Sequence, residues 1–160
     1  MKLRCRPVAD NNHDLEFLYI VYASTRLEEL APTGWSPSKI EEFLRMQFTL
    51  QHEQYRTNYS NASFEIISVE KTEVGRLYVD RRNNDIRIMD IALLPDFRKK
   101  GIGGKIFNDL IKEADSACLP LSLHVEMNNP ILPYYTKLGF INKGEVGVYY
   151  FMERISPNSI

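Results

Sequence analysis

The chain has 160 residues, of which 44% are hydrophobic and 26% are charged, and its formal net charge at pH 7 is −1. This length fits one domain with a real core. The absence of a basic excess argues against a general nucleic-acid or membrane-surface binder. The longest apolar runs are far shorter than the roughly 20 residues that cross a bilayer.

The opening segment MKLRCRPVADNN lacks the hydrophobic region of a signal peptide, so we expect a cytoplasmic protein. Cys5 and Cys118 have neither metal-ligand nor redox-motif spacing, and we expect both to be reduced, buried thiols. The sequence thus predicts no metal site.

The N-terminal third predicts a short strand over residues 3–8 and then two helices. The first helix is expected over about residues 10–30, because apolar side chains recur there at helical spacing. Ser36 followed by Pro37 predicts the start of the second helix, since serine caps a helix and proline suits its first position. This helix should run to about residue 59.

Three segments rich in β-branched and aromatic residues come next, and they predict an antiparallel meander: SFEIISVE, EVGRLYVD and DIRIMDIALL. A helix is expected after Gly101, then the strand LPLSLHVEM, then a short helix closed by Gly139 and a final hairpin. The order predicts one α/β domain over residues 1–155, with a mixed, mostly antiparallel sheet and helices on both faces. Residues 156–160 are expected to be frayed.

The stretch PDFRKKGIGGK, residues 95–105, places glycines and cations where a strand becomes a helix. A helix that begins at Gly101 exposes unpaired backbone N–H groups, and its dipole is positive there. The glycines leave room for a bulky anion, and Arg98, Lys99 and Lys100 add full positive charge. These features predict a phosphate or pyrophosphate site. The alternative is that the glycines only turn the chain and the cations only solvate it.

Two familiar nucleotide loops are excluded by spacing. A P-loop needs a glycine where Lys99 stands and Ser or Thr where Ile106 stands. A dinucleotide fingerprint needs its third glycine at the position of Ile106.

The segment from Arg98 to Gly103 resembles the Arg/Gln-x-x-Gly-x-Gly/Ala loop of the GNAT superfamily of N-acetyltransferases, which cradles the pyrophosphate of coenzyme A. NPILPYYTKLGF, residues 129–140, is similar to the family's Asn-Pro-Ala…Leu-Tyr-Glu-Arg-Leu-Gly-Phe segment, although Ile131 and Pro133 depart from that pattern. The predicted order of elements also resembles the family along nearly the whole chain.

The resemblance implies a GNAT-like domain whose strands splay at the cofactor site, between the strand that ends near Leu93 and the strand over residues 121–127. Acetyl-CoA would bind there as cosubstrate. The residues expected to contact it are Ile91, Ala92, Leu93, Arg98, Lys99, Lys100, Gly101, Ile102, Gly103, Gly104, Asn129 and Tyr135.

The resemblance also assigns a general acid, because Tyr135 matches the tyrosine that protonates the departing thiolate. A tyrosine with a pKa of about 10 gives modest help to a thiol with a pKa near 8.5. The alternative is that Tyr135 is a packing aromatic beside Tyr134.

The general base is left open. Many relatives carry Glu or His at positions that match Arg87 or Met89, which cannot serve. The candidates are Asp90, Glu126, Glu29 or a water relay. Strand alternation points Asp90 to the other face of its strand, unless a β-bulge turns it back. Asp90 could instead be a buried carboxylate that accepts hydrogen bonds from backbone amides.

The acceptor side has three candidate residues. Glu29 near a helix end would attract a cationic amine, Trp35 would line the pocket or join the helices, and Arg87 would favour an acceptor with a carboxylate.

The leading hypothesis is direct transfer of an acetyl group to a primary amine of a small molecule or peptide. The alternatives are a coenzyme A-binding sensor or interaction module without turnover, and an unrelated phosphate-binding domain. The resemblance also suggests a homodimer, and no nucleic-acid or membrane partner is expected.

Overall fold

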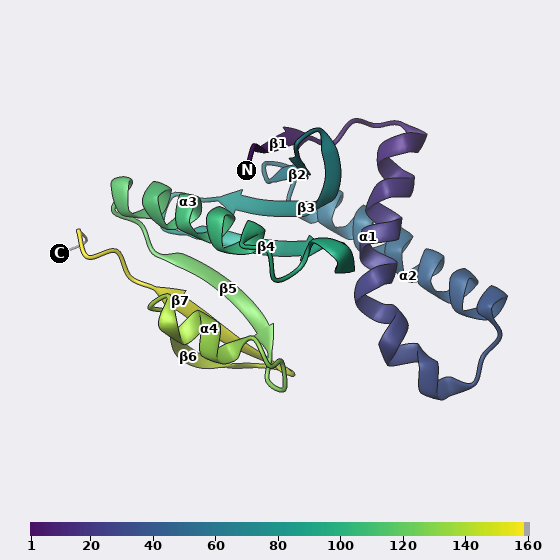
Figure 1. Ribbon diagram of the computed structural model, residues 1–160. Helices are drawn as coiled ribbons and strands as arrows, with labels where there is room; N and C mark the ends of the chain where they lie inside the picture. The colour runs from purple at the N-terminus through teal and green to yellow at the C-terminus, as the bar shows by residue number, and fades with distance from the viewer. Residues whose placement is uncertain (159–160) are drawn as a thin grey trace. The chain divides into compact units, whose positions relative to one another are not determined.

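The computed structural model describes residues 1–158, and its strands form one seven-stranded sheet (Figure 1). The strands are β1 (Leu3–Pro7), β2 (Ser63–Val69), β3 (Thr72–Arg81), β4 (Ile86–Leu93), β5 (Leu121–Glu126), β6 (Ile141–Val146) and β7 (Tyr149–Arg154). Their order in the sheet is β1-β2-β3-β4-β5-β7-β6. β4 and β5 pair in parallel, whereas β1 with β2, β5 with β7, and β6 with β7 are antiparallel. The predicted mixed α/β fold is confirmed.

Four α-helices complete the fold: α1 (Asn12–Leu30), α2 (Pro37–Asn58), α3 (Ile102–Ser116) and α4 (Leu132–Lys137). Two short 3₁₀ turns, η1 (Ala31–Thr33) and η2 (Pro95–Phe97), precede α2 and α3. The order of the elements is the one predicted from the sequence. None of the helices within the described chain is long and apolar enough to cross a bilayer.

The chain forms two compact units. The first contains Met1–Tyr78 and Asp90–Lys100, and the second contains Val79–Met89 and the described residues from Gly101 onward. β3 and β4 therefore contribute residues to both units. The expected splaying of β4 and β5 concerns both units and stays a prediction.

In the first unit, α1 and α2 begin where the sequence provides caps. The side chain of Asn11 accepts a hydrogen bond from the Asp14 amide at the start of α1. Ser36 accepts one from the Lys39 amide, and Pro37 takes the first position of α2, as predicted. The two helices pack through aromatic rings, with Phe48 of α2 close to Tyr19 and Tyr22 of α1. Leu18, Val21 and Leu44 are almost fully buried there.

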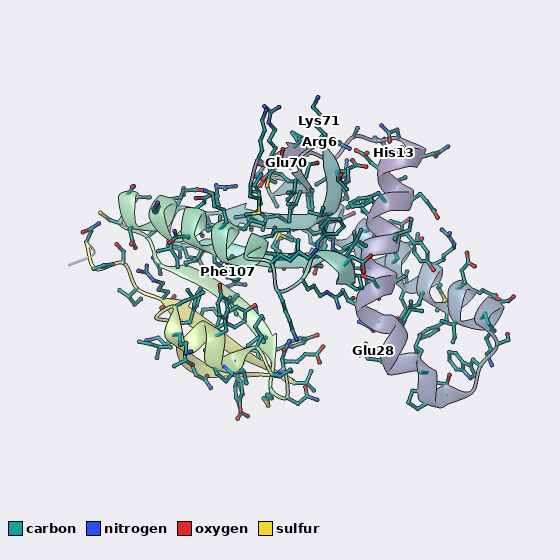
Figure 2. All side chains as sticks on the ribbon, in the orientation of Figure 1. Arg6, His13, Glu28, Glu70, Lys71 and Phe107 are labelled. Atoms are coloured by element: carbon teal, nitrogen blue, oxygen red, sulfur yellow. The ribbon has the colours of Figure 1, made fainter. Side chains whose placement is uncertain are left out.

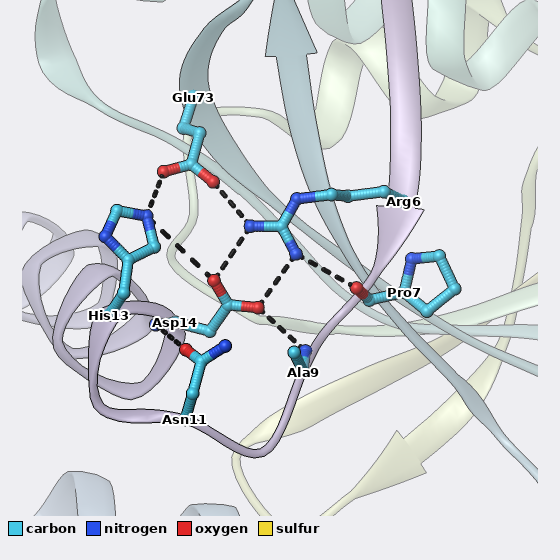
Figure 3. A network of polar contacts seen from close by, with 7 residues as sticks. All are labelled: Arg6, Pro7, Ala9, Asn11, His13, Asp14 and Glu73. Carbon is cyan, nitrogen blue, oxygen red and sulfur yellow. Dashed lines mark hydrogen bonds and ion pairs between the residues drawn. The ribbon is translucent and has the colours of Figure 1, made fainter.

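A polar network joins β1, α1 and β3 within the first unit (Figure 3). The Arg6 guanidinium donates to both carboxylate oxygens of Asp14 at 2.8 Å and to Glu73 at 2.6 Å. The Ala9 amide also donates to Asp14, at 2.7 Å. The hydrogen bonds from Arg6, opposed by burial and helped by the Ala9 amide, hold the pKa of Asp14 at about 2. The network therefore anchors the first turn of α1 through a buried carboxylate.

In the second unit, α3 packs on β5 through an apolar stripe. Its buried residues are Ile102, Ile106, Phe107, Leu110 and Ala114, which are spaced as an amphipathic helix requires. From Leu123 onward, β5 alternates as a half-buried strand does, with Leu123 and Val125 buried and His124 and Glu126 exposed.

The two cysteines and the C-terminal residues differ from the sequence expectations. Cys118 is exposed and was wrongly expected to be buried, whereas Cys5 is half-buried. Ser156 is 1% exposed, and the Asn158 amide donates to its hydroxyl at 3.1 Å. The remainder of the segment expected to be frayed, residues 159–160, lies outside the described residues, and the domain bounds stay a prediction.

Candidate functional site

The last residues of β4 lie beside a glycine that the sequence analysis did not single out. Ile91, Ala92 and Leu93 are half-buried. A Cβ atom on Gly75 of β3 would lie 2.2 Å from the carbonyl oxygen of Ala92 and 2.9 Å from a methyl carbon of Leu93. Only glycine at this position allows β3 to come so close to the end of β4.

The stretch PDFRKKGIGGK, residues 95–105, is called the glycine loop below. Its three cations follow η2 and are exposed: Arg98, Lys99 and Lys100. Arg98 Nε donates to the carbonyl oxygen of Leu93 at 2.9 Å, which ties the loop to the end of its strand. Lys99 has a φ of 60°, in the left-handed region, and Lys100 Nζ lies 5.9 Å from the ring centroid of Phe97. No ion pair involves these three cations in the part of the chain that the structure describes. Their charges are therefore available to an anionic ligand.

Gly101 starts α3 with a φ of 85°, a left-handed conformation that favours glycine, and no side chain caps this helix. The Lys105 amide makes the first helical hydrogen bond, to Gly101 O at 3.0 Å. A Cβ atom on Gly103 would have no neighbour within 4 Å. The first turn therefore offers backbone N–H groups and open space, as an anion site at a helix N-terminus requires.

The two tyrosines of α4 lie in different surroundings. Tyr135 is only 7% exposed and lies among aromatic rings, with centroids 5.5 Å from Phe107 and 5.7 Å from Phe140. Tyr134 is 37% exposed, and its hydroxyl lies 3.6 Å from where a Cβ atom on Gly104 would be. Packing thus accounts for the Tyr135 ring, and its role as general acid stays a prediction.

The residues that lead into α4 form a hydrogen-bonded turn. The Asn129 amide donates to Glu126 O at 3.0 Å, and its side-chain oxygen accepts from the Ile131 amide at 3.0 Å. Glu126 is exposed at the end of β5, opposite Tyr149 of β7. Asn129 therefore shapes this turn, whatever ligand it contacts.

Asp90, the first candidate base, pairs with an arginine that sequence reasoning missed. Its carboxylate accepts a hydrogen bond from Arg76 Nη2, and the Arg76 side chain is only 4% exposed. The hypothesis that Asp90 is a buried carboxylate named backbone amides as its partners, but the structure shows this guanidinium. The negative charge of Asp90 is therefore balanced within the protein.

Arg76 lies among polar and aromatic side chains of the first unit. Its Nη2 also donates to Gln51 Oε1 at 3.2 Å, and its guanidinium lies 4.9 Å from the ring centroid of Tyr78. Tyr55 of α2 contacts Tyr78 edge to face, at 5.8 Å between centroids. Burial, helped by the charge of Asp90, raises the pKa of Tyr55 to about 12. The only sequence signal for this cluster was a cation inside the apolar segment EVGRLYVD.

The predicted acceptor residues of the first unit make local contacts. Glu29 lies in the last turn of α1, near the helix end as expected, and pairs with Arg26 at 3.3 Å. Trp35 packs edge to face on Phe43 of α2, at 5.4 Å between centroids, and Lys39 Nζ lies 4.6 Å from its ring. Both residues thus have structural partners of their own.

Arg87 in the second unit bridges two strands. Its Nε donates to Ser122 Oγ at 2.8 Å, and its guanidinium lies 5.4 Å from the ring of Phe151. His124 Nδ1 lies 3.4 Å from Arg87 Nη1. Desolvation, and then the positive charge of Arg87, lowers the pKa of His124. This histidine is therefore held neutral near pH 7.

One group has the composition of a metal site. His13, Asp14 and Glu73 bring potential ligand atoms within 4.8 Å of one another. However, Arg6 already donates to both carboxylates (Figure 3), so a cationic side chain takes the place of an ion. We assign no metal to this group.

Comparisons with known proteins give one family. The model of the acetyltransferase (GNAT) family matches residues 27–140. The search of curated proteins found no match to the chain. The fold is similar to that of the PaiA N-acetyltransferase from Thermoplasma acidophilum in complex with coenzyme A, with a TM-score of 0.69 and 21% identity over 97% of this chain and 99% of that chain.

Two further solved structures are similar at lower identity. One is a histone acetyltransferase HPA2 and related acetyltransferase from Corynebacterium glutamicum, with a TM-score of 0.67 and 17% identity over 98% of this chain and 97% of that chain. The other is an acetyltransferase from Thermus thermophilus, with a TM-score of 0.65 and 17% identity over 97% of each chain. These likenesses show the fold, and the family match covers most of the sequence. The chain thus belongs to the acetyltransferase (GNAT) family, as its glycine loop and its Asn-Pro segment indicated.

Proposed function

We propose that this protein is an N-acetyltransferase that moves an acetyl group from acetyl-CoA directly to a primary amine of a small molecule or peptide. The observation that carries the proposal is the first turn of α3, with Gly101 in a left-handed conformation, no side-chain cap and open space at Gly103. The family match supports the same reaction class. The Thermoplasma protein of similar fold is described in complex with coenzyme A.

The loop residues would act mainly as a binding site for the coenzyme. The backbone N–H groups of the first turn of α3 would donate to the pyrophosphate, and Lys99 and Lys100 would add charge that no carboxylate of the described chain neutralises. Acetyl-CoA supplies the acetyl group as a thioester, whose thiolate leaves. The end of β4, from Ile91 to Leu93, would contribute backbone contacts, and no metal is needed.

Proton transfer has two parts. A free amine with a pKa of about 10.4 is only about one part in a thousand neutral at pH 7.5, a cost near 4 kcal/mol, so a base or a water relay must take its proton. Glu126 fits this role better than Asp90, because Arg76 balances the charge of Asp90. Tyr135 is proposed to protonate the leaving thiolate.

The chemical features of the acceptor are proposed from two residues. Arg87 would favour an amine that also carries a carboxylate, and Glu29 would attract the ammonium group. The binding-module alternative predicts affinity for the coenzyme without turnover. A cytoplasmic location and a homodimer stay predictions from the sequence and the family resemblance.

The first test is isothermal titration with acetyl-CoA, with ATP and NAD as controls. We expect micromolar binding of acetyl-CoA alone, and roughly tenfold weaker binding in the double variant Lys99→Gln/Lys100→Gln. Lys105→Gln is the matched control, because Lys105 already pairs with Asp109 at 3.0 Å. If the unaltered protein does not bind acetyl-CoA, the proposal is wrong.

Turnover is then measured as coenzyme A release with a panel of amines. Tyr135→Phe should lower kcat by about 10²-fold or more, with little change in acetyl-CoA affinity. Binding without release of coenzyme A from any amine would favour the binding module.

A further inference from the structure

We propose that β1 and the turn between β2 and β3 form a second anion-binding site, specific for small phosphate-bearing molecules. A hollow of about 280 Å³ lies there, and its lining residues are Lys2, Arg4, Arg6, Ser68 and Lys71. All of them belong to the first unit, and none is part of the glycine loop. This site does not depend on the proposed acetyltransferase activity.

Strand register brings the cations to one face. Arg4 pairs with Ser68 and Arg6 pairs with Ile66 in the antiparallel ladder of β1 and β2. Because alternate residues of a strand share a face, Lys2, Arg4 and Arg6 form a row with the Ser68 hydroxyl opposite its centre.

The turn that follows β2 adds the fourth cation. Glu70 and Lys71 have φ values of 50° and 72°, so the chain reverses through two left-handed residues. The Glu70 amide donates to Lys2 O at 3.0 Å, and Glu70 Oε1 accepts from the Lys2 amide at 2.7 Å. The turn is thereby attached to the start of β1. Figure 2 labels Glu70, Lys71 and Arg6, which lie near one another beside β1 and the turn between β2 and β3.

The charges of the hollow are unevenly compensated. Arg6 pairs with Asp14 and Glu73. In contrast, the side chains of Lys2, Arg4 and Lys71 form no ion pair with any residue between Met1 and Asn158. Three cations without an ion-pair partner thus line the hollow together with Ser68, in a chain whose net charge is −1. Their mutual repulsion costs free energy that a bound anion would recover.

The chemistry of the lining selects phosphate. Lysine and arginine side chains bind phosphate through charge-assisted hydrogen bonds, and a serine hydroxyl can donate a further one. Cations on β1 also protect the edge of the sheet from pairing with another chain. Edge protection needs only exposed charge, whereas a phosphate site needs the charges to converge on one ligand, and this difference can be tested.

The test uses inorganic pyrophosphate as the probe, in isothermal titrations of the variants named below. The glycine loop also binds pyrophosphate under the proposed function, so the double variant Lys99→Gln/Lys100→Gln is the background. Pyrophosphate should still bind to this variant. Adding Arg4→Gln and Lys71→Gln should weaken the remaining binding at least tenfold.

Two controls complete the design. Circular dichroism melts should show that all variants fold, because the altered side chains are exposed. Lys39→Gln with Lys112→Gln removes two cations elsewhere and should leave the affinity unchanged. The proposal is wrong if Arg4→Gln/Lys71→Gln leaves pyrophosphate binding unchanged, or if Lys39→Gln/Lys112→Gln weakens it equally. Binding of single-stranded RNA through Arg4 and Lys71, without binding of pyrophosphate, would also overturn it.

Discussion

The replacement Asp90→Ala tests whether the carboxylate of β4 is a counterion or a catalytic base. Asp90 is the carboxylate partner of Arg76, whose side chain is 4% exposed, and Asp90 itself is 21% exposed. Removing one partner of a buried ion pair costs about 3–5 kcal/mol, because the other charge stays buried without compensation. Since water reaches part of Asp90, we expect a loss near 3 kcal/mol in the free energy of unfolding.

The assay is urea unfolding of the unaltered protein, Asp90→Ala, Arg76→Leu and the double variant. Arg76 and Asp90 act together, so the double variant should lose about 2 kcal/mol less than the sum of the single losses. Asp96→Ala is the control, because Asp96 is exposed in the same segment and should change stability by no more than about 0.5 kcal/mol. Unchanged stability of Asp90→Ala would refute the reasoning from the ion pair.

Turnover of the same variants separates the two roles. If Asp90 were the base, Asp90→Asn would lower kcat by about 10²- to 10⁴-fold, whereas Arg76→Leu would keep the base and much of the rate. If Asp90 is a counterion, both variants should lose stability, and their rates should fall by similar factors.

Two further predictions concern packing and pH. Gly75→Ala places a Cβ atom 2.2 Å from Ala92 O. We expect this variant to lose about 1–3 kcal/mol in the free energy of unfolding, measured with urea, and to bind acetyl-CoA more weakly. Gly103→Ala is the control, because its Cβ atom would have open space and should not destabilise the fold. The pKa of Asp14 is lowered to about 2 by Arg6, so its contribution to stability is present above about pH 4 and is lost as pH falls toward 2. Because the Arg6 side chain is 42% exposed, we expect Asp14 to contribute about 1–2 kcal/mol to the free energy of unfolding. The difference in Tm between the unaltered protein and Asp14→Asn should therefore shrink at low pH. An equal difference in Tm at neutral and at low pH would contradict this assignment.

The sequence alone determined the features that depend on neighbouring residues. Ser36 and Pro37 marked the start of α2, and the left-handed glycines 101 and 139 marked the start of α3 and the end of α4. Capping and left-handed backbone are local properties, so a single sequence reveals them. The stretches around Gly101 and Gly139 also carried the resemblance to the acetyltransferase family.

The tertiary structure decided which side chains meet across the fold. The partner of Asp90 is 14 positions away on another strand, and the burial of Tyr135 depends on Phe107 of α3. The exposure of Cys118 likewise could not be read from its own neighbours. These contacts depend on strand register and on helix packing, which bring together residues that no local rule connects. For that reason the family and the glycine loop could be identified from the sequence, whereas the ion pair of Asp90 and the cationic hollow at β1 could not.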